Sequence, residues 1–309
     1  MKTTTGLGLR VWRRLRQLTS SSRRPANLPA LLSAATLSLS VGGCVGAQPI
    51  TPQTVQALEQ EESGVVALAT MLDNDPLHVT LCSGALIASN LVLTARHCVS
   101  HAITSSPSCD ARGRSHNGAH LSADANPATI AVYVGEHVRV DRDVPRAHGL
   151  QTLHPVGKVL CDADVAFIVL DQPLVGVAIL PLRLVGTVAS GDSVLPVGFG
   201  GGTALTIGDR VGRNGSTVLS IGPAANAETG AVLGPREFEV DRATCRGDSG
   251  GPAIDTMTGE IVGVVSRGGS CSAEGNHVYT RIDSYAPLAR LALLEASRAA
   301  MIAESVAAK

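Results

Sequence analysis

Three short segments of the sequence carry side chains that together suit nucleophilic catalysis. Ser249 stands in the glycine-rich stretch CRGDSGGP, where a sharp turn exposes a hydroxyl and aims backbone amides at a developing oxyanion. His97 ends the stretch LTARH after an apolar run, and Asp164 stands directly before another apolar run. A serine, a histidine and a carboxylate are the nucleophile, the base and the orienting group of acyl-transfer chemistry.

Short β-branched runs between clusters of turn residues predict the elements that position these side chains. The runs recur from residue 64 with almost no helical pattern between them, which predicts an all-β barrel or sandwich. Residues 100–127 are expected to form a long surface loop. After residue 284, apolar residues at helical spacing predict a terminal amphipathic helix docked on the barrel. The expected strands are 65–71, 79–82, 91–94, 129–134, 165–170, 194–199, 217–221, 238–240, 261–266 and 277–282.

The composition excludes several classes of protein. A chain of 309 residues, 44% of them hydrophobic, can fill one large or two small cores, and no apolar run reaches the ~18 residues of a spanning helix. Seven of the 25 Lys and Arg lie in residues 1–43, which leaves 18 bases against all 26 acids and a charge of about −8 on the rest. We therefore expect no nucleic-acid partner.

The N-terminus has the order of an export signal. A basic stretch is followed by an apolar stretch over residues 28–41 and two glycines. The sequence VGGC ending at Cys44 resembles a bacterial lipoprotein processing site, at which the cysteine is acylated and becomes the first residue. A plain signal peptide is the alternative. The remaining six cysteines are an even number, which suits an oxidising compartment, and residues 44–63 read as a polar tether.

Taken in order, these motifs resemble those of the chymotrypsin/trypsin-like serine peptidases. The matching stretches lie within residues 64–290 and include CSGALI, LTARHC, DVAFIVL, GFG and CRGDSGGP. The resemblance implies two packed six-stranded antiparallel β-barrels with a C-terminal helix. Residues 247–251 also satisfy the G-x-S-x-G pattern of α/β-hydrolases, but those enzymes run Ser, Asp, His along the chain. The order here is His97, Asp164, Ser249.

The resemblance also implies roles for individual residues. Ser249 would attack the scissile carbonyl, His97 would take and return its proton, and Asp164 would hold the imidazole. The amides of Gly247 and Ser249 would form the oxyanion hole. Ser266 matches a serine whose hydroxyl supports the aspartate.

Cysteine pairing and metal binding follow from the same resemblance. Cys82–Cys98 and Cys245–Cys271 match family bridges, which leaves Cys109 and Cys161 to pair and Cys44 for the lipid. We expect no cofactor and no metal, because three histidines of the long loop lack a compact ligand spacing and the calcium-like stretch after Glu136 carries Arg146 in place of an acid. The three histidines are His101, His116 and His120.

Two departures from the family concern charges near the site. Asp248 would pair with a newly cut Ile-Val-Gly-Gly terminus, but residues 44–81 contain no such tetrad, so Asp248 needs another partner or a different cleavage. Arg96 replaces the usual alanine before the histidine. Paired with Asp162 it would be harmless, and paired with Asp164 it would weaken the base. Asp162 itself is expected to be dispensable.

The primary specificity is predicted to be non-basic. Ala243 falls at the pocket floor, where trypsin-like enzymes place an aspartate, so a Lys or Arg of the substrate would find no counter-charge. Thr244 and Gly268 leave room for a medium apolar side chain. Alternatively, His277 could receive a glutamate carboxylate. Two arginines, Arg246 and Arg267, would assist that alternative, although Arg267 stands where an aromatic residue normally lines the groove.

The sequence as a whole predicts an exported serine endopeptidase held at the bacterial cell envelope by a lipid anchor, or otherwise secreted. Its partners would be protein or peptide substrates, the membrane and possible protein inhibitors. A catalytically silent binding module is the alternative. The expected division is an export signal over 1–43, the lipidated cysteine and tether over 44–63, the peptidase domain over 64–290 and the helix over 284–309.

Overall fold

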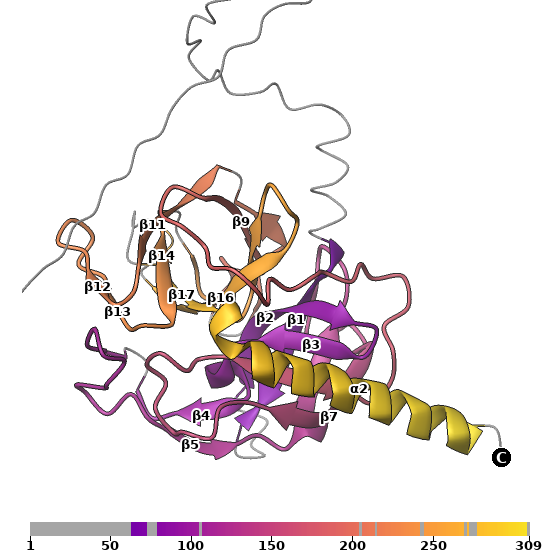
Figure 1. The fold of residues 1–309 in the computed structure, drawn as a ribbon. Coiled ribbons are helices and arrows are strands. Elements are labelled where there is room, and N and C mark those ends of the chain that lie inside the picture. Colours follow the sequence, from indigo (N-terminus) through magenta and orange to yellow (C-terminus); the bar gives the residue numbers. More distant parts are fainter. Residues whose placement is uncertain are drawn as a thin grey trace, which may run out of the picture. The chain divides into compact units, whose positions relative to one another are not determined.

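The first half of the described chain folds into a closed antiparallel barrel (Figure 1). The computed structural model describes residues 63–72, 79–104, 107–203, 206–213, 215–241, 244–268, 271 and 277–307. The predicted export signal and residues 44–62 of the predicted tether, including Cys44, lie outside them. In their order around the barrel, the strands are β1 (Val65–Met71), β2 (Val79–Ala88), β3 (Leu91–Thr94), β8 (Ala166–Leu170), β7 (Ala147–Leu153) and β6 (Ile130–Tyr133).

The second half forms another antiparallel barrel. Six strands close into a ring because the last strand of the sheet also pairs with an earlier one, and a short seventh strand, β10 (Val211–Gly212), adds to the edge. The predicted fold of two six-stranded barrels is confirmed. The six strands are β9 (Ser193–Gly198), β11 (Ser216–Ile221), β14 (Glu237–Val240), β17 (His277–Arg281), β16 (Ile261–Arg267) and β15 (Pro252–Asp255).

Side-chain alternation along the strands divides the core into layers. In β1, Val66 and Leu68 belong to the cluster that fills the first barrel. Their neighbours Val65 and Ala67 belong to a different cluster, which joins the outside of this barrel to residues of the second barrel and of the C-terminal helix. Strands that are buried on both faces read as continuous apolar runs, which explains why they were visible in the sequence.

The C-terminal helix, α2 (Ala286–Ala307), runs along the first barrel (Figure 1). Ala289, Ala292 and Ala296 recur at helical spacing and are buried against the shared cluster. The small side chains let the helix approach closely, and Asn90 Nδ2 donates a 2.9 Å hydrogen bond to the Ala296 carbonyl. The predicted helix is therefore confirmed. Among the described residues, no helix combines the length and hydrophobicity needed to cross a bilayer.

Some predicted elements differ from the structure. Residues 100–127 contain a small two-stranded sheet, β4 (Ser100–Ala102) and β5 (Leu121–Asp124), rather than only a loop. Strands β7 and β15 were not expected, because β7 lacks a β-branched run and β15 contains a proline and an aspartate. Both are fixed by partners on two sides, so tertiary pairing overrides weak local propensity there. Two further pairs of residues, β12 (Ala224–Ala225) and β13 (Val232–Leu233), form a small separate sheet.

Candidate active site

His97 and Asp164 meet at the ends of two paired strands of the first barrel. Strand β3 pairs with β8, and Thr94 lies opposite Ala166. The short helical turn Arg96–Cys98 follows β3, and Asp164 stands just before β8. The His97 amide donates to Asp164 Oδ1 at 2.9 Å, and His97 Nδ1 lies 2.8 Å from Oδ2. Because a carboxylate only accepts hydrogen bonds, Nδ1 carries the proton and Nε2 keeps its lone pair.

Burial and charge act against each other in this pair. Burial disfavours a charge on His97, but the Asp164 carboxylate outweighs it and raises the pKa of His97. Burial likewise disfavours the Asp164 anion, but His97 and the Ser266 hydroxyl, which donates to Oδ2 at 2.8 Å, lower the pKa of Asp164. The pair is therefore arranged to hold an imidazolium beside a carboxylate.

Ser249 comes from the second barrel and opens on a cavity of about 920 Å³ that His97 also lines. The turn that carries it includes Gly247 at φ +101°, where a Cβ atom would lie 2.6 Å from the Phe199 carbonyl oxygen. Glycine is required there for both reasons. Within the described residues, neither the Gly247 nor the Ser249 amide donates to a backbone carbonyl, so both are available to an oxyanion in the cavity.

Ser83 on β2 was not singled out in the sequence, yet it fixes this turn. Its amide donates to the Ser249 carbonyl at 2.8 Å, and its hydroxyl donates to the Gly247 carbonyl at 2.7 Å. The Phe199 amide donates to the same hydroxyl at 2.9 Å. Ser83 is fully buried, and a serine within a buried strand beside Cys82 was the available signal.

Asp248 is buried and receives three donors. The Gly200 amide donates to Oδ1 at 2.7 Å, and the Cys245 amide donates to Oδ2 at 2.8 Å. Arg213 Nη2 lies 2.7 Å from Oδ2. Burial raises the pKa of Asp248, and Arg213 and the amides oppose that shift. The missing partner of Asp248 is thus an arginine that sequence reasoning did not identify.

Both expected pairings of Arg96 are wrong. Its side chain is buried, but Nη1 donates to the Pro155 carbonyl at 2.7 Å, and Nη2 lies 3.9 Å from Asp124. It forms no ion pair with Asp162 or Asp164. Loop carbonyls bind Nη1 and a different carboxylate lies near Nη2, so the guanidinium does not compete with His97 for the orienting aspartate.

Asp162 connects the two barrels through hydrogen bonds. It is buried at φ +62°, and its amide donates to Glu237 Oε1 at 2.9 Å. The Arg236 amide donates to its carboxylate, and the Tyr285 hydroxyl donates to its carbonyl. These bonds connect the segment that carries Asp164 to β14 and to the start of α2.

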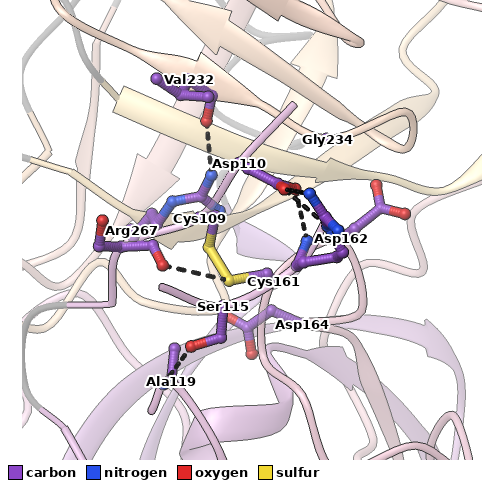
Figure 2. The surroundings of a disulfide bond; sticks show 12 residues. Cys109, Asp110, Ser115, Ala119, Cys161, Asp162, Asp164, Val232, Gly234 and Arg267 are labelled. Carbon is purple, nitrogen blue, oxygen red and sulfur yellow. Dashed lines mark hydrogen bonds and ion pairs between the residues drawn. A yellow bond between two sulfur atoms is a disulfide. The ribbon is translucent and has the colours of Figure 1, made fainter. Parts of the chain in front are cut away.

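Arg267 is committed to the protein interior. Its guanidinium contacts both oxygens of the buried Glu237, at 2.5 and 2.7 Å, and donates to the Val232 carbonyl at 3.0 Å (Figure 2). The guanidinium is therefore not available as a partner for a substrate carboxylate, which corrects part of the acidic alternative. Glu237 was also absent from the sequence-based site, because nothing in its local sequence marks it as buried.

Thr244 and Gly268 line the cavity as expected, whereas Ala243 lies outside the described residues. His277 is fully buried beside them. The Thr244 amide donates to its Nδ1 at 3.2 Å, and a Cβ atom on Gly268 would lie 2.9 Å from the same nitrogen. Because an amide can only donate, Nδ1 is an acceptor and the proton of the neutral ring sits on Nε2.

Three disulfides join the pairs that the resemblance implied. One of them, Cys109–Cys161, lies beside Asp162 and Asp164 (Figure 2). Cys82, His97 and Cys98 come close enough to suggest a metal site, but both cysteines are oxidised and offer no thiolate. The other bridges are Cys82–Cys98 and Cys245–Cys271.

Two closed six-stranded barrels, with a serine and a histidine lining one cavity and a buried aspartate bound to that histidine, are typical of the chymotrypsin-like fold. A solved structure of an inactivated protease paralogue from the scabies mite is similar in fold, with a TM-score of 0.57 and 19% sequence identity, and covers 76% of this chain and 96% of that one. The family model described as Trypsin matches residues 59–289. The chain belongs to the trypsin family.

Individual relatives agree with this family. Trypsin V-A of Rattus norvegicus is 29% identical over 216 residues, which are 66% of this chain and 76% of the relative. The cercarial protease of Schistosoma mansoni is 25% identical over 198 residues, or 61% of this chain and 71% of the relative. A snake venom serine protease of Gloydius brevicauda is 28% identical over 207 residues, or 61% and 67%. Homologues of the chain are thus serine proteases.

Proposed function

We propose that this chain is an exported serine endopeptidase that forms an acyl-enzyme on Ser249. The observation that carries the proposal is that Ser249 and His97 line the same cavity while the buried Asp164 lies 2.8 Å from His97 Nδ1. Among the described residues, the Gly247 and Ser249 amides donate to no backbone carbonyl. Membership of the trypsin family supports it. The site needs no further group, because nucleophile, base and oxyanion donors all come from the chain.

The chemistry follows from these positions. Ser249 Oγ attacks the peptide carbonyl while His97 Nε2 accepts the hydroxyl proton, and Asp164 stabilises the imidazolium. The Gly247 and Ser249 amides hold the oxyanion of the tetrahedral intermediate. When the C–N bond breaks, His97 returns the proton to the leaving amine. A water molecule then repeats the sequence on the acyl-enzyme, which releases the acid and restores Ser249.

Labelling with a fluorophosphonate probe tests this proposal. The wild-type chain should be labelled and should hydrolyse peptides, and Ser249→Ala should lose both while it unfolds at the same temperature as the wild type. Ser193→Ala, which changes an exposed serine on β9, is the matched control and should keep both activities. A folded wild-type chain without labelling or hydrolysis would contradict the proposal and favour the silent binding module.

We also propose a non-basic, apolar primary specificity. Among the described residues that line the cavity there is no carboxylate, so a buried Lys or Arg of the substrate would stay unpaired. Thr244 and Gly268 line the side of the cavity next to His277. Two contacts weaken the alternative in which a substrate glutamate binds here. Arg267 pairs with Glu237, and the Thr244 amide donates to His277 Nδ1.

A peptide library profiled around pH 7.5 decides among these specificities. We expect cleavage after medium apolar residues and little cleavage after Lys or Arg. A strong Lys/Arg preference would overturn the pocket argument. A glutamate preference that is lost in His277→Ala would favour the acidic alternative.

We further propose that Cys44 carries a lipid anchor at the bacterial envelope. The three disulfides support export to an oxidising compartment, and the VGGC sequence supports acylation. The protein should then partition into detergent, and Cys44→Ser should release it or stall its processing. Intact-mass spectrometry that finds another first residue would contradict the anchor.

A further inference from the structure

The carboxylate of Asp248, next to the candidate nucleophile Ser249, forms an ion pair with an arginine of the same chain. Asp248 is 1% exposed, and its Oδ2 lies 2.7 Å from Arg213 Nη2. In the family that this chain resembles, a newly cut amino terminus supplies the corresponding cation. We propose that Arg213 replaces that terminus, so that the turn carrying Ser249 holds its form in the uncut chain. This inference rests on the proposed function, because it assigns how that site becomes competent.

The structure builds a closed cradle for the Asp248 carboxylate. The Gly200 amide donates to Oδ1, and the Cys245 amide and Arg213 share Oδ2. A Cβ atom on Gly198 or Gly200 would collide with Asp248, so both glycines are needed for the close approach. With one amide on Oδ1 and an amide and a cation on Oδ2, the carboxylate is satisfied as a buried anion.

Asp248 controls the turn because of its place in it. It lies between Gly247 and Ser249, which both line the cavity, and its own carbonyl accepts from the Gly251 amide at 2.8 Å. If the carboxylate left its cradle, the peptide planes on both sides would rotate. The two donors of the oxyanion hole would then no longer converge on one point.

Arg213 is held in place as firmly as its partner. Its amide donates to the Pro196 carbonyl at 2.9 Å, and its carbonyl accepts from the Ser216 hydroxyl at 2.7 Å. Its side chain is only 18% exposed. Burial raises the pKa of Asp248 and Arg213 opposes that rise, so the arginine favours the ionised form on which the cradle depends.

Charge variants of Arg213 test the assignment. In Arg213→Met, kcat/KM should fall on the order of 100-fold or more, mainly through kcat, as expected when oxyanion donors are misplaced. Arg213→Lys restores the charge without the geometry and should recover part of that loss. The matched control is Arg183→Met, because Arg183 is 14% exposed and also pairs at 2.7 Å with a buried carboxylate, that of Asp255. The control should keep kcat/KM within about 3-fold, as remote changes do. Equal activities in Arg213→Met and Arg183→Met would overturn the proposal.

A second arm examines the amino terminus. Two samples are compared: the full chain, whose terminus upstream of residue 63 is intact or chemically acetylated, and the chain trimmed within residues 44–63. Intact mass verifies each terminus. Both samples should have the same kcat/KM. Activity that appears only after trimming would overturn the proposal.

A third measurement separates this inference from the proposed function. If the folded wild-type chain shows no hydrolysis, the proposed function fails, and thermal unfolding then judges the ion pair alone. Arg213→Met and Asp248→Asn should together lower the melting temperature by less than the sum of their separate effects, because each removes the same pair. Additive effects would overturn the assignment of Arg213.

Discussion

Replacement of Asp164 by asparagine tests the proposed base most directly. The carboxylate receives three hydrogen bonds: the His97 amide on Oδ1, and His97 Nδ1 and the Ser266 hydroxyl on Oδ2. An asparagine has one acceptor oxygen and one amino group, so one of these two positions must become a donor. The structure decides which one.

The amino group should replace Oδ2. The His97 backbone amide can only donate, and an amino group opposite it would leave two buried donors facing each other, at a cost of about 1–3 kcal/mol. The His97 ring nitrogen and the Ser266 hydroxyl can both switch to accepting. The substituted side chain would therefore donate to Nδ1, which moves the ring proton to Nε2 and removes the lone pair that Ser249 needs.

The expected loss follows from that tautomer. In serine proteases whose orienting aspartate is changed to asparagine, kcat falls by about 10⁴ with the geometry intact. At about 1.36 kcal/mol for each factor of ten, this is roughly 5.4 kcal/mol of transition-state stabilisation. The same loss should be measured here as kcat with a chromogenic peptide. Melting temperatures should show that Asp164→Asn remains folded.

Asp162→Asn is the matched control. An asparagine keeps the oxygen that accepts from the Arg236 amide and tolerates φ +62°. It loses only a 3.5 Å contact with the half-exposed Arg236 side chain, which is worth about 0–1 kcal/mol. We expect kcat within about 3-fold of the wild type, which is ~0.6 kcal/mol. Equal damage from both substitutions, or less than about a 10-fold loss in Asp164→Asn, would refute the reasoning on the base.

Three further predictions follow from the charges and bridges around the site. Because the pKa of His97 is raised and the base must be neutral, kcat/KM should increase with pH through a midpoint above 6.5, and a lower midpoint would contradict the pair. Arg267→Met should lower the free energy of unfolding by about 3–5 kcal/mol by leaving Glu237 charged and buried, and adding Glu237→Leu should recover much of it in urea titrations. Replacement of both Cys109 and Cys161 by serine removes a bridge between residues 52 positions apart, which should lower the free energy of unfolding by about 4 kcal/mol in the same titrations. Probe labelling should persist, and unchanged stability would show that the bridge is dispensable.

The sequence predicted the fold because both barrels depend on doubly buried strands. Runs such as Val65–Met71 and Ile261–Arg267 are apolar on both faces, so they stand out from their surroundings. Strand β15 does not, because its sequence is PAID and its pairing with β9 and β16 supplies what local propensity lacks. The small sheet within residues 100–127 was hidden for the same reason, since its two strands are short and mostly polar.

The candidate triad was predictable because each member stands in a distinctive local motif. The buried charged residues that surround the triad were not predictable in this way. Arg213 and Glu237 occupy stretches that look like ordinary solvated surface, and Arg267 ends an apolar strand. The partners of all three come from other segments of the chain. Whether a charged side chain is buried depends on which distant segments pack over it. Hydrophobic periodicity in the local sequence does not reveal those segments. Arg96 shows the same limit, because the two carboxylates that the sequence analysis offered it, Asp162 and Asp164, are not its partners.

These buried polar contacts explain how one site can be divided between two barrels. His97 and Asp164 belong to the first barrel and Ser249 to the second. On one side, Ser83 of β2 binds the carbonyls of Ser249 and Gly247. On the other, the segment before β8 is tied through Asp162 to Glu237 of β14. Apolar packing between the barrels would tolerate small sliding motions, whereas hydrogen bonds at both flanks do not. The register between base and nucleophile therefore depends on polar groups that do no chemistry themselves.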